Sequence, residues 1–149
     1  MNYRVFTAID LTPNVIQKIV DYEKSFQKQF PTILRWTKSD QLHLTLKFVG
    51  ELGEKDLKLI SEELHENFST QARFPLDFSG SGIFPSLKSP RIFWIGIQSS
   101  AELLKLFKKN EESFQKFGYS PEKRPFQGHI TIGRFKENSA YAELEQFLS

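Results

Sequence analysis

The chain has 149 residues, of which 39% are hydrophobic and 26% are charged, and its formal net charge is +2. This size and composition predict a single globular domain over residues 1–149, and the small net charge excludes a protein that coats duplex nucleic acid by neutralising phosphates. There is no cysteine, no apolar run near the roughly 20 residues of a membrane span, and no signal-peptide pattern, so we expect a cytoplasmic protein without disulfides.

The first half of the chain alternates between strand and helix patterns. We predict a strand over residues 3–9, followed by a helix that is capped by Thr12, has Pro13 in its first turn and stops at Pro31. Strands over 34–37 and 42–49 flank the polar turn "KSDQ". Apolar residues at helical spacing predict a second helix over 54–68.

The second half continues in the same way. We predict a strand over 74–78, a loop rich in glycine and proline over 80–90, and a strand over 91–97. A helix over 101–117 is capped by Ser100 and ended by Gly118. The polar loop "SPEKRPFQG" leads to a strand over 129–135 and a short helix over 139–148. Because the strand pairs lack helical crossovers, we predict an α+β fold with antiparallel sheets.

The stretch "QLHLTLKFVG" (41–50) carries a polar pattern on a predicted strand. Side chains alternate between the two faces of a strand, so His43, Thr45 and Lys47 share the face opposite to the leucines. The stretch "QGHITIGRF" (127–135) repeats the pattern with His129 and Thr131. Each copy follows a strand and a long helix. We therefore predict an internal duplication, with two pseudo-symmetric lobes and outer helices around a central cleft.

Two histidines, each two residues before a threonine, indicate acid–base chemistry. A single strand histidine is more often structural, but a matched pair favours function. Histidine has an unperturbed pKa of about 6.5, so one ring can act as a base while another acts as an acid. Threonine hydroxyls can hold phosphate oxygens without adding charge. This combination suits phosphodiester transfer through a cyclic ester, with no cofactor or metal required.

The motifs "HLTL" and "HITI" resemble the paired signature of the two-histidine (2H) phosphoesterases. The blocks "RWTKSDQLHLTLKFVGEL", "SGIFPSLKSPRIFWIGI" and "HITIGRF" are similar to the RNA 2′,3′-cyclic phosphodiesterases, also called 2′-5′ RNA ligases, and the similarity covers residues 3–135. Members of this family usually continue for a few tens of residues after the second motif, adding strands to one sheet. The resemblance therefore implies an exposed sheet edge here, or a shortened chain.

The resemblance implies a role for each motif residue. His43 is the general acid to the departing 2′ oxygen, His129 is the general base on water, and Thr45 and Thr131 bind the phosphate. The product is an RNA end with a 2′-phosphate, and the reverse reaction would join a cyclic phosphate to a 5′-hydroxyl in a 2′-5′ linkage. The partners implied are RNA ends or nucleotides with a 2′,3′-cyclic phosphate, and we expect a monomer.

Two basic residues near the motifs have alternative interpretations. Arg134 follows His129 by five residues and points to the opposite face of a regular strand, but a bulge at Gly133 would turn it toward the phosphate. Related sequences carry an arginine here, so we predict a substrate contact, with a plain surface arginine as the alternative. Lys47 contacts the RNA backbone or is only a solvated charge.

Aromatic residues near the motifs are candidates for stacking on a base. These are Trp36, Phe84, Trp94 and Phe126, of which Phe126 is the preferred one, although most of the fifteen phenylalanines must be core. Lys123 and Arg124 could meet the RNA backbone.

Three alternatives to this prediction stay open at the level of the sequence. One is a related enzyme that cleaves ADP-ribose 1″,2″-cyclic phosphate or a 2′-5′ oligoadenylate, and another is a non-catalytic RNA-end binder. A zinc site formed by His43, His129 and His65 is the third, but neither motif brings a second ligand at metal spacing. His65 lies in a charged helical stretch, and we assign it no role.

Overall fold

The computed structural model describes residues 1–29 and 33–136, so the helix predicted over 139–148 lies outside the described residues. In this part of the chain, α-helices and β-strands are interspersed, and the paired strands of the larger sheet run antiparallel. The predicted α+β class with antiparallel sheets is confirmed. No helix in the described ranges is both long and apolar enough to cross a bilayer.

The chain divides into two compact units built from interleaved segments. Unit 1 contains Met1–Ile9, Thr45–Asp77 and Gln98–Gly128. Unit 2 contains Asp10–Leu44, Phe78–Ile97 and the described residues from His129 onward. The boundary falls between Leu44 and Thr45, inside the first motif. The organisation of both units as one domain stays a prediction.

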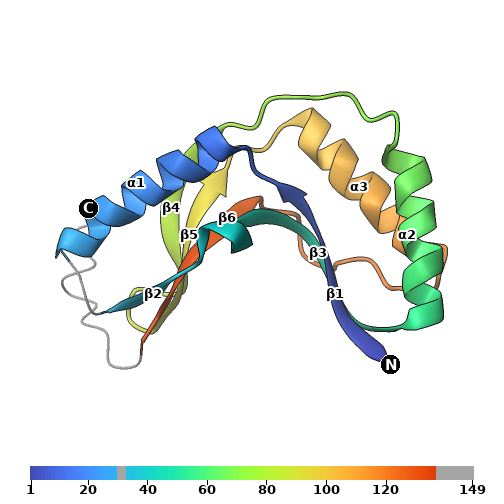
Figure 1. Cartoon of the computed structure of the whole chain (residues 1–149), viewed down its shortest axis with the longest axis horizontal. Coiled ribbons are helices and arrows are strands. Elements are labelled where there is room, and N and C mark those ends of the chain that lie inside the picture. Colours follow the sequence, from blue (N-terminus) through green and yellow to red (C-terminus); the bar gives the residue numbers. More distant parts are fainter. Residues whose placement is uncertain (30–32, 137–149) are drawn as a thin grey trace. The chain divides into compact units, whose positions relative to one another are not determined.

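Unit 1 joins a short sheet to two helices. Strands β1 (Asn2–Asp10) and β3 (His43–Gly53) form a two-stranded sheet, and α2 (Glu54–Phe68) lies beside α3 (Ala101–Gln115) (Figure 1). Leu52, Ile60 and Phe114 form the buried centre of this unit. Because these residues come from β3, α2 and α3, their burial holds both helices against the sheet.

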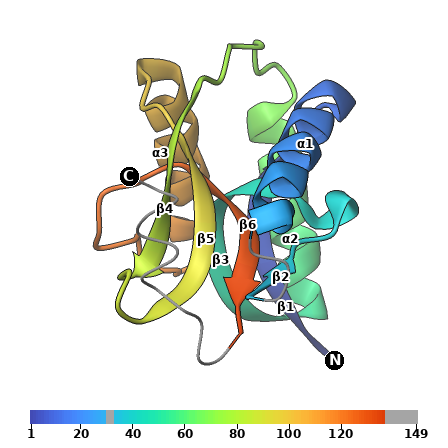
Figure 2. The same ribbon diagram turned by 90° about the vertical axis from the view of Figure 1, so that its left-hand side faces the viewer.

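Unit 2 is a four-stranded antiparallel sheet with one long helix. The strand order is β2 (Leu34–Trp36), β6 (His129–Phe135), β5 (Pro90–Ile97) and β4 (Phe78–Pro85) (Figure 2). Helix α1 (Pro13–Gln29) packs on one face of this sheet through Phe26, which is fully buried and meets the ring of Phe93 edge-on at 4.9 Å. Trp36 meets the Phe26 ring at 5.5 Å and belongs to the same aromatic core.

The predicted helix caps are confirmed. The Thr12 hydroxyl accepts a hydrogen bond from the Val15 N–H at 3.4 Å, and the Ser100 hydroxyl accepts one from the Leu103 N–H at 3.1 Å. Each side chain thereby satisfies a backbone donor that the first helical turn leaves free. Gly118 has a φ of +86°, and the Tyr119 N–H donates back to the Phe114 carbonyl at 3.2 Å. This left-handed residue ends α3, whose last regular residue is Gln115.

The predicted strand over 74–78 is wrong, and part of the predicted loop is a strand. Strand β4 begins at Phe78 and runs through two serines and two glycines to Pro85. Pairing with β5 stabilises this glycine-rich segment, and Gly82 lies opposite Trp94. A Cβ atom at Gly82 would come within 2.2 Å of the Trp94 ring, so the indole needs glycine there. Pairing with β5 and the space that the indole needs therefore override the low strand propensity of glycine.

Glu23 is a charged group in the apolar face of α1. It is only 6% exposed, and its Oε1 atom has no hydrogen-bond partner among the described residues. Burial raises the pKa of the Glu23 carboxyl to about 7 because a desolvated carboxylate is disfavoured.

We predict that Glu23→Gln removes a pH-dependent loss of stability. The pKa of Glu23 in the folded chain is above the ordinary value of 4.5, so the folded state binds the extra proton between these values and the free energy of unfolding falls as pH rises from about 4.5 to 7. At pH 8 the variant should be more stable than the wild type by about 1–2 kcal/mol. Urea unfolding at pH 5 and pH 8 measures the free energy of unfolding of both proteins. The same stability difference between variant and wild type at both pH values would contradict the prediction.

Candidate active site

The pairing register of unit 2 places His129 and Thr131 on the sheet face opposite α1. Residues directly opposite one another on antiparallel strands share a face. Gly96 pairs with His129 and Trp94 with Thr131, whereas Ile95 pairs with Ile130. Ile130 and Ile132 are fully buried, and His129 and Thr131 are half-buried. Burial of the two isoleucines thus turns the imidazole and the hydroxyl to the other side.

Two aromatic rings lie beside His129 on this face. Phe84 and Trp94 have ring centroids 5.8 Å and 6.3 Å from the imidazole, and both meet it close to edge-on. The two rings also contact one another at 5.4 Å. Phe84 is 41% exposed, so its ring offers an accessible apolar surface next to the histidine. Such a surface suits stacking on a nucleobase.

Arg134 lies on the same face because β6 contains a bulge. Trp94 pairs with Thr131, Phe93 with Gly133 and Ile92 with Arg134, so β6 uses one residue more than β5 across this step. Ile92 and Trp94 are two residues apart and share a face, and their partners Thr131 and Arg134 therefore share it too. The sequence was compatible with a regular strand or with a bulge at Gly133. The structure has a bulge between Thr131 and Gly133. The substrate contact of Arg134 itself stays a prediction.

Lys47 makes protein contacts in the interior of unit 1. Its side chain is 4% exposed, and its ammonium lies 2.9 Å from Glu111 Oε1 and donates to the Ser120 carbonyl at 3.1 Å. The second carboxylate oxygen of Glu111 accepts from the Glu122 N–H at 2.8 Å. Leu46 is buried as well, so the simple alternation of the motif stops before Lys47. The RNA contact predicted for Lys47 is untested, but these partners account for its charge.

The ion pair between Lys47 and Glu111 holds the loop that leads to the second motif. The loop runs from α3 toward His129 and carries Phe126, whose ring stacks on Phe107 of α3 at 4.5 Å with an interplanar angle of 10°. One face of the Phe126 ring is therefore occupied by Phe107. Base stacking by Phe126 stays a prediction, as does stacking by Trp36, whose ring packs in the core of unit 2.

The first motif residues lie at the start of β3. His43 and Thr45 are both half-buried, and His43 belongs to the same compact unit as His129. His65 is exposed on α2. Among the described residues, no three histidine, aspartate, glutamate or cysteine side chains gather as a metal site would require.

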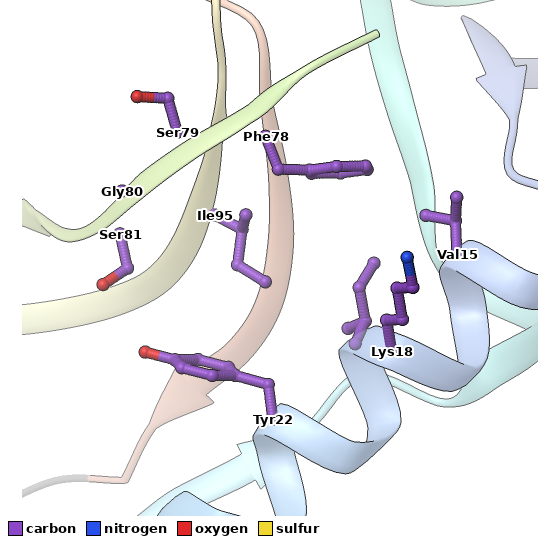
Figure 3. Close-up of a pocket in the computed structure, with 9 residues that line it drawn as sticks. Val15, Lys18, Tyr22, Phe78, Ser79, Gly80, Ser81 and Ile95 are labelled. Atoms are coloured by element: carbon purple, nitrogen blue, oxygen red, sulfur yellow. The ribbon is translucent and has the colours of Figure 1, made fainter.

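A cavity of about 380 Å³ lies in unit 2 between α1 and the β4–β5 ribbon. Figure 3 shows Tyr22 and Lys18 from α1 together with Phe78 and Ser81 from β4 around it. Ile95 also lines it and pairs with Ile130, on the face away from His129. The cavity is therefore separate from the His129 face of the sheet.

Comparison with known proteins assigns the chain to a family. A model of the 2′-5′ RNA ligase superfamily matches residues 14–149, so the chain belongs to this superfamily of 2H phosphoesterases. An RNA 2′,3′-cyclic phosphodiesterase of Archaeoglobus fulgidus is 34% identical over 138 residues, which are 91% of this chain and 74% of that protein. The protein of the same name from Thermotoga maritima is 34% identical over 134 residues, 89% of this chain and 70% of its own length.

Solved structures have the same fold. Escherichia coli LigT in complex with 3′-AMP aligns with a TM-score of 0.71 at 29% identity, covering 94% of this chain and 78% of LigT. A protein of Thermus thermophilus aligns with a TM-score of 0.81 at 24% identity, covering 93% and 77% of the two chains. The family and fold class implied by the two histidine motifs are thus confirmed.

We predict that breaking the buried ion pair destabilises the protein. Lys47→Met leaves Glu111 buried without its cation, which should lower the free energy of unfolding by about 3–5 kcal/mol. Adding Glu111→Leu should recover part of the loss because the unpaired carboxylate is then gone. Lys116→Met is a matched control, since Lys116 pairs with Glu63 at the surface and is 63% exposed; its cost should be much smaller because water screens an exposed pair. Urea unfolding measures all four proteins, and a Lys47→Met cost equal to that of the control would refute the prediction.

We predict that Gly82→Ala disturbs His129 through Trp94. The added methyl group would lie 2.2 Å from the indole, which must shift away from its contact with the imidazole. The resonances of the His129 ring should therefore move, because the aromatic ring beside them changes position, and stability should fall by about 1–3 kcal/mol. In Gly53→Ala the new atom would meet only the Asn2 side chain at 3.8 Å. NMR of labelled imidazoles compares the two variants, and unchanged His129 resonances in Gly82→Ala would rule out this coupling.

Proposed function

We propose that this chain is an RNA 2′,3′-cyclic phosphodiesterase that opens a 2′,3′-cyclic phosphate to a 2′-phosphate. The observation that carries the proposal is the joint placement of His129, Thr131 and Arg134 on one sheet face, beside the exposed ring of Phe84. This face combines an acid–base group, a hydroxyl, a cation and a stacking surface. Relatives that are 34% identical over most of the chain carry this activity in their names.

The proposed reaction needs one base and one acid on opposite sides of the phosphorus atom. His129 takes a proton from water as its oxygen forms a bond to phosphorus, and His43 gives a proton to the departing sugar oxygen. Thr45 and Thr131 donate hydrogen bonds to the non-bridging oxygens, and Arg134 stabilises their negative charge. The assignment of acid and base to the two histidines follows the family resemblance.

The bond that breaks corrects one detail of the expected mechanism. In a 2′-phosphate product the phosphate stays on the 2′ oxygen, so the P–O3′ bond is the one that breaks. The proton from His43 therefore goes to the 3′ oxygen, not to the 2′ oxygen that the resemblance had suggested. The ligation direction follows from the same step, since a 5′-hydroxyl in place of water would give a 2′-5′ linkage without ATP.

The proposed substrate is an RNA end or nucleotide in the cytoplasm, and the proposed chemistry uses no metal ion. An RNA end suits a protein whose net charge is only +2, because contacts at an end are local. The crystal structure of LigT in complex with 3′-AMP supports a nucleotide ligand for this fold.

We predict that each motif histidine is required for turnover. His43→Ala and His129→Ala should each lower kcat/KM for an oligonucleotide 2′,3′-cyclic phosphate by about 10²- to 10⁴-fold, since each removes one proton transfer. The double variant should lose less than the product of the two losses, because the residues act as a unit. EDTA should leave the wild-type rate unchanged.

His65→Ala is the matched control, because this histidine is exposed on α2 and lies outside both motifs. It should keep the wild-type rate. Full activity in either motif variant, or loss of activity with EDTA, would contradict the proposed mechanism. Specificity constants for ADP-ribose 1″,2″-cyclic phosphate and a 2′-5′ oligoadenylate, measured in the same assay, test whether the RNA end is the preferred substrate.

A further inference from the structure

A second arginine lies directly beside Arg134 on the His129 face. Arg35 of β2 pairs with Arg134 of β6, while its neighbours Leu34 and Trp36 pair with Phe135 and Gly133. Leu34 is buried and Trp36 packs on Phe26 of α1, so both point to the helix-covered face. Arg35 lies between them in the strand and therefore points to the opposite face, the one that carries Thr131 and Arg134.

The pairing holds two positive charges close together. The flanking pairs are hydrogen-bonded, with the Thr37 N–H donating to the Ile132 carbonyl at 3.0 Å and the Lys136 N–H donating to the Ile33 carbonyl at 2.9 Å. Every second pair is of this kind, so Arg35 and Arg134 also form a hydrogen-bonded pair, with Cα atoms about 5.5 Å apart. Both side chains are exposed, and neither makes an ion pair with any described residue.

Like charges directly opposite one another destabilise a sheet. An anion between the two guanidinium groups removes this repulsion, and phosphate fits because its oxygens accept two parallel hydrogen bonds from an arginine. Without an anion the pair has no stabilising role in the fold. The arrangement is thus explained by a ligand that brings negative charge to this edge of the sheet.

The order of the strands sets the direction of this ligand across the face. Phe84 and Trp94 lie on β4 and β5, on one side of His129, and Arg35 lies on β2, on the other side. Arg134 is about 7 Å along the sheet from Thr131, since their partners Ile92 and Trp94 are two residues apart. With a base at the aromatic rings and the reacting phosphate at Thr131 and Arg134, Arg35 is left for a further phosphate.

We propose that Arg35 binds the backbone phosphate on the 5′ side of the terminal nucleotide of an RNA substrate, next to Arg134, which stabilises the reacting phosphate. This inference rests on the proposed function, and it adds a subsite that selects oligonucleotides over single nucleotides. Arg35 is exposed and lies outside the core of unit 2, so its replacement leaves the fold intact.

The test compares two substrates that share the reacting group. For Arg35→Gln, kcat/KM should fall about tenfold on a tetranucleotide with a 2′,3′-cyclic phosphate, the loss expected for one charge-assisted hydrogen bond. It should change less than about twofold on a mononucleoside 2′,3′-cyclic phosphate, which has no second phosphate. The slope of log kcat/KM against log salt concentration should decrease by about 0.7 on the tetranucleotide.

A substrate with a neutral methylphosphonate at the proposed phosphate locates the contact. It should lower the wild-type rate by the same factor as Arg35→Gln and should not affect the Arg35→Gln variant further. Arg35→Lys should keep part of the preference for the tetranucleotide. Lys24→Gln is the matched control, because it removes one exposed positive charge from α1, on the other face of the same sheet.

Two results would overturn the subsite. Equal losses of kcat/KM on both substrates in Arg35→Gln would place Arg35 at the reacting phosphate. Equal losses of kcat/KM in Arg35→Gln and Lys24→Gln would show that Arg35 acts only through the overall charge of the protein. If the wild type cleaves neither substrate, the proposed function fails, and the subsite is then tested by fluorescence anisotropy. Weaker binding of the labelled tetranucleotide to Arg35→Gln, but not of its methylphosphonate form, would still support it, and unchanged binding would reject it.

Discussion

The register of β6 between β2 and β5 is the constraint on which the site depends. Ile130 and Ile132 are fully buried on the α1 side, and burial of each such side chain contributes about 1.5–3 kcal/mol. A shift of the strand by one residue would expose both and would bury His129 and Thr131 instead. The orientation of His129 and Thr131 is thus set by the hydrophobic effect acting on the neighbouring isoleucines.

The bulge in β6 extends this arrangement. A regular strand would place Arg134 on the α1 side, where a guanidinium would meet the rings of Phe93 and Trp36. The extra residue near Gly133 reverses the alternation after Thr131 and leaves the buried face apolar. It also turns Phe135 inward, where its ring stacks on Phe93 at 6.2 Å. One local irregularity therefore satisfies the core and adds a cation to the polar face.

Much of the fold could be predicted because its signals are local. Helix caps at Thr12 and Ser100 and the alternation in both motifs depend on a few neighbouring residues, and they gave the correct elements. The strand β4 was missed because it is stabilised by pairing with β5, and its Gly82 makes room for the ring of Trp94, whereas glycine by itself has a low strand propensity. The pairing of Arg35 with Arg134 was missed for the same reason, since "RW" in a short strand carries no signal of its partner. Sequence spacing gave the candidate residues, and only the register showed which of them share a face.

The electrostatics of the chain depend on where its charges are placed and not on their sum. The charge of Lys47 is balanced by Glu111 in the interior of unit 1, so it adds little to the field outside the protein. Arg35 and Arg134 are exposed side by side and have no described counter-ion, so their fields add at one edge of the His129 face. A chain with a net charge of +2 attracts a polyanion weakly along its length. Arg35 and Arg134 instead bring two positive charges to the face that carries His129, and under the proposed function this placement favours recognition of an RNA end over binding along an RNA strand.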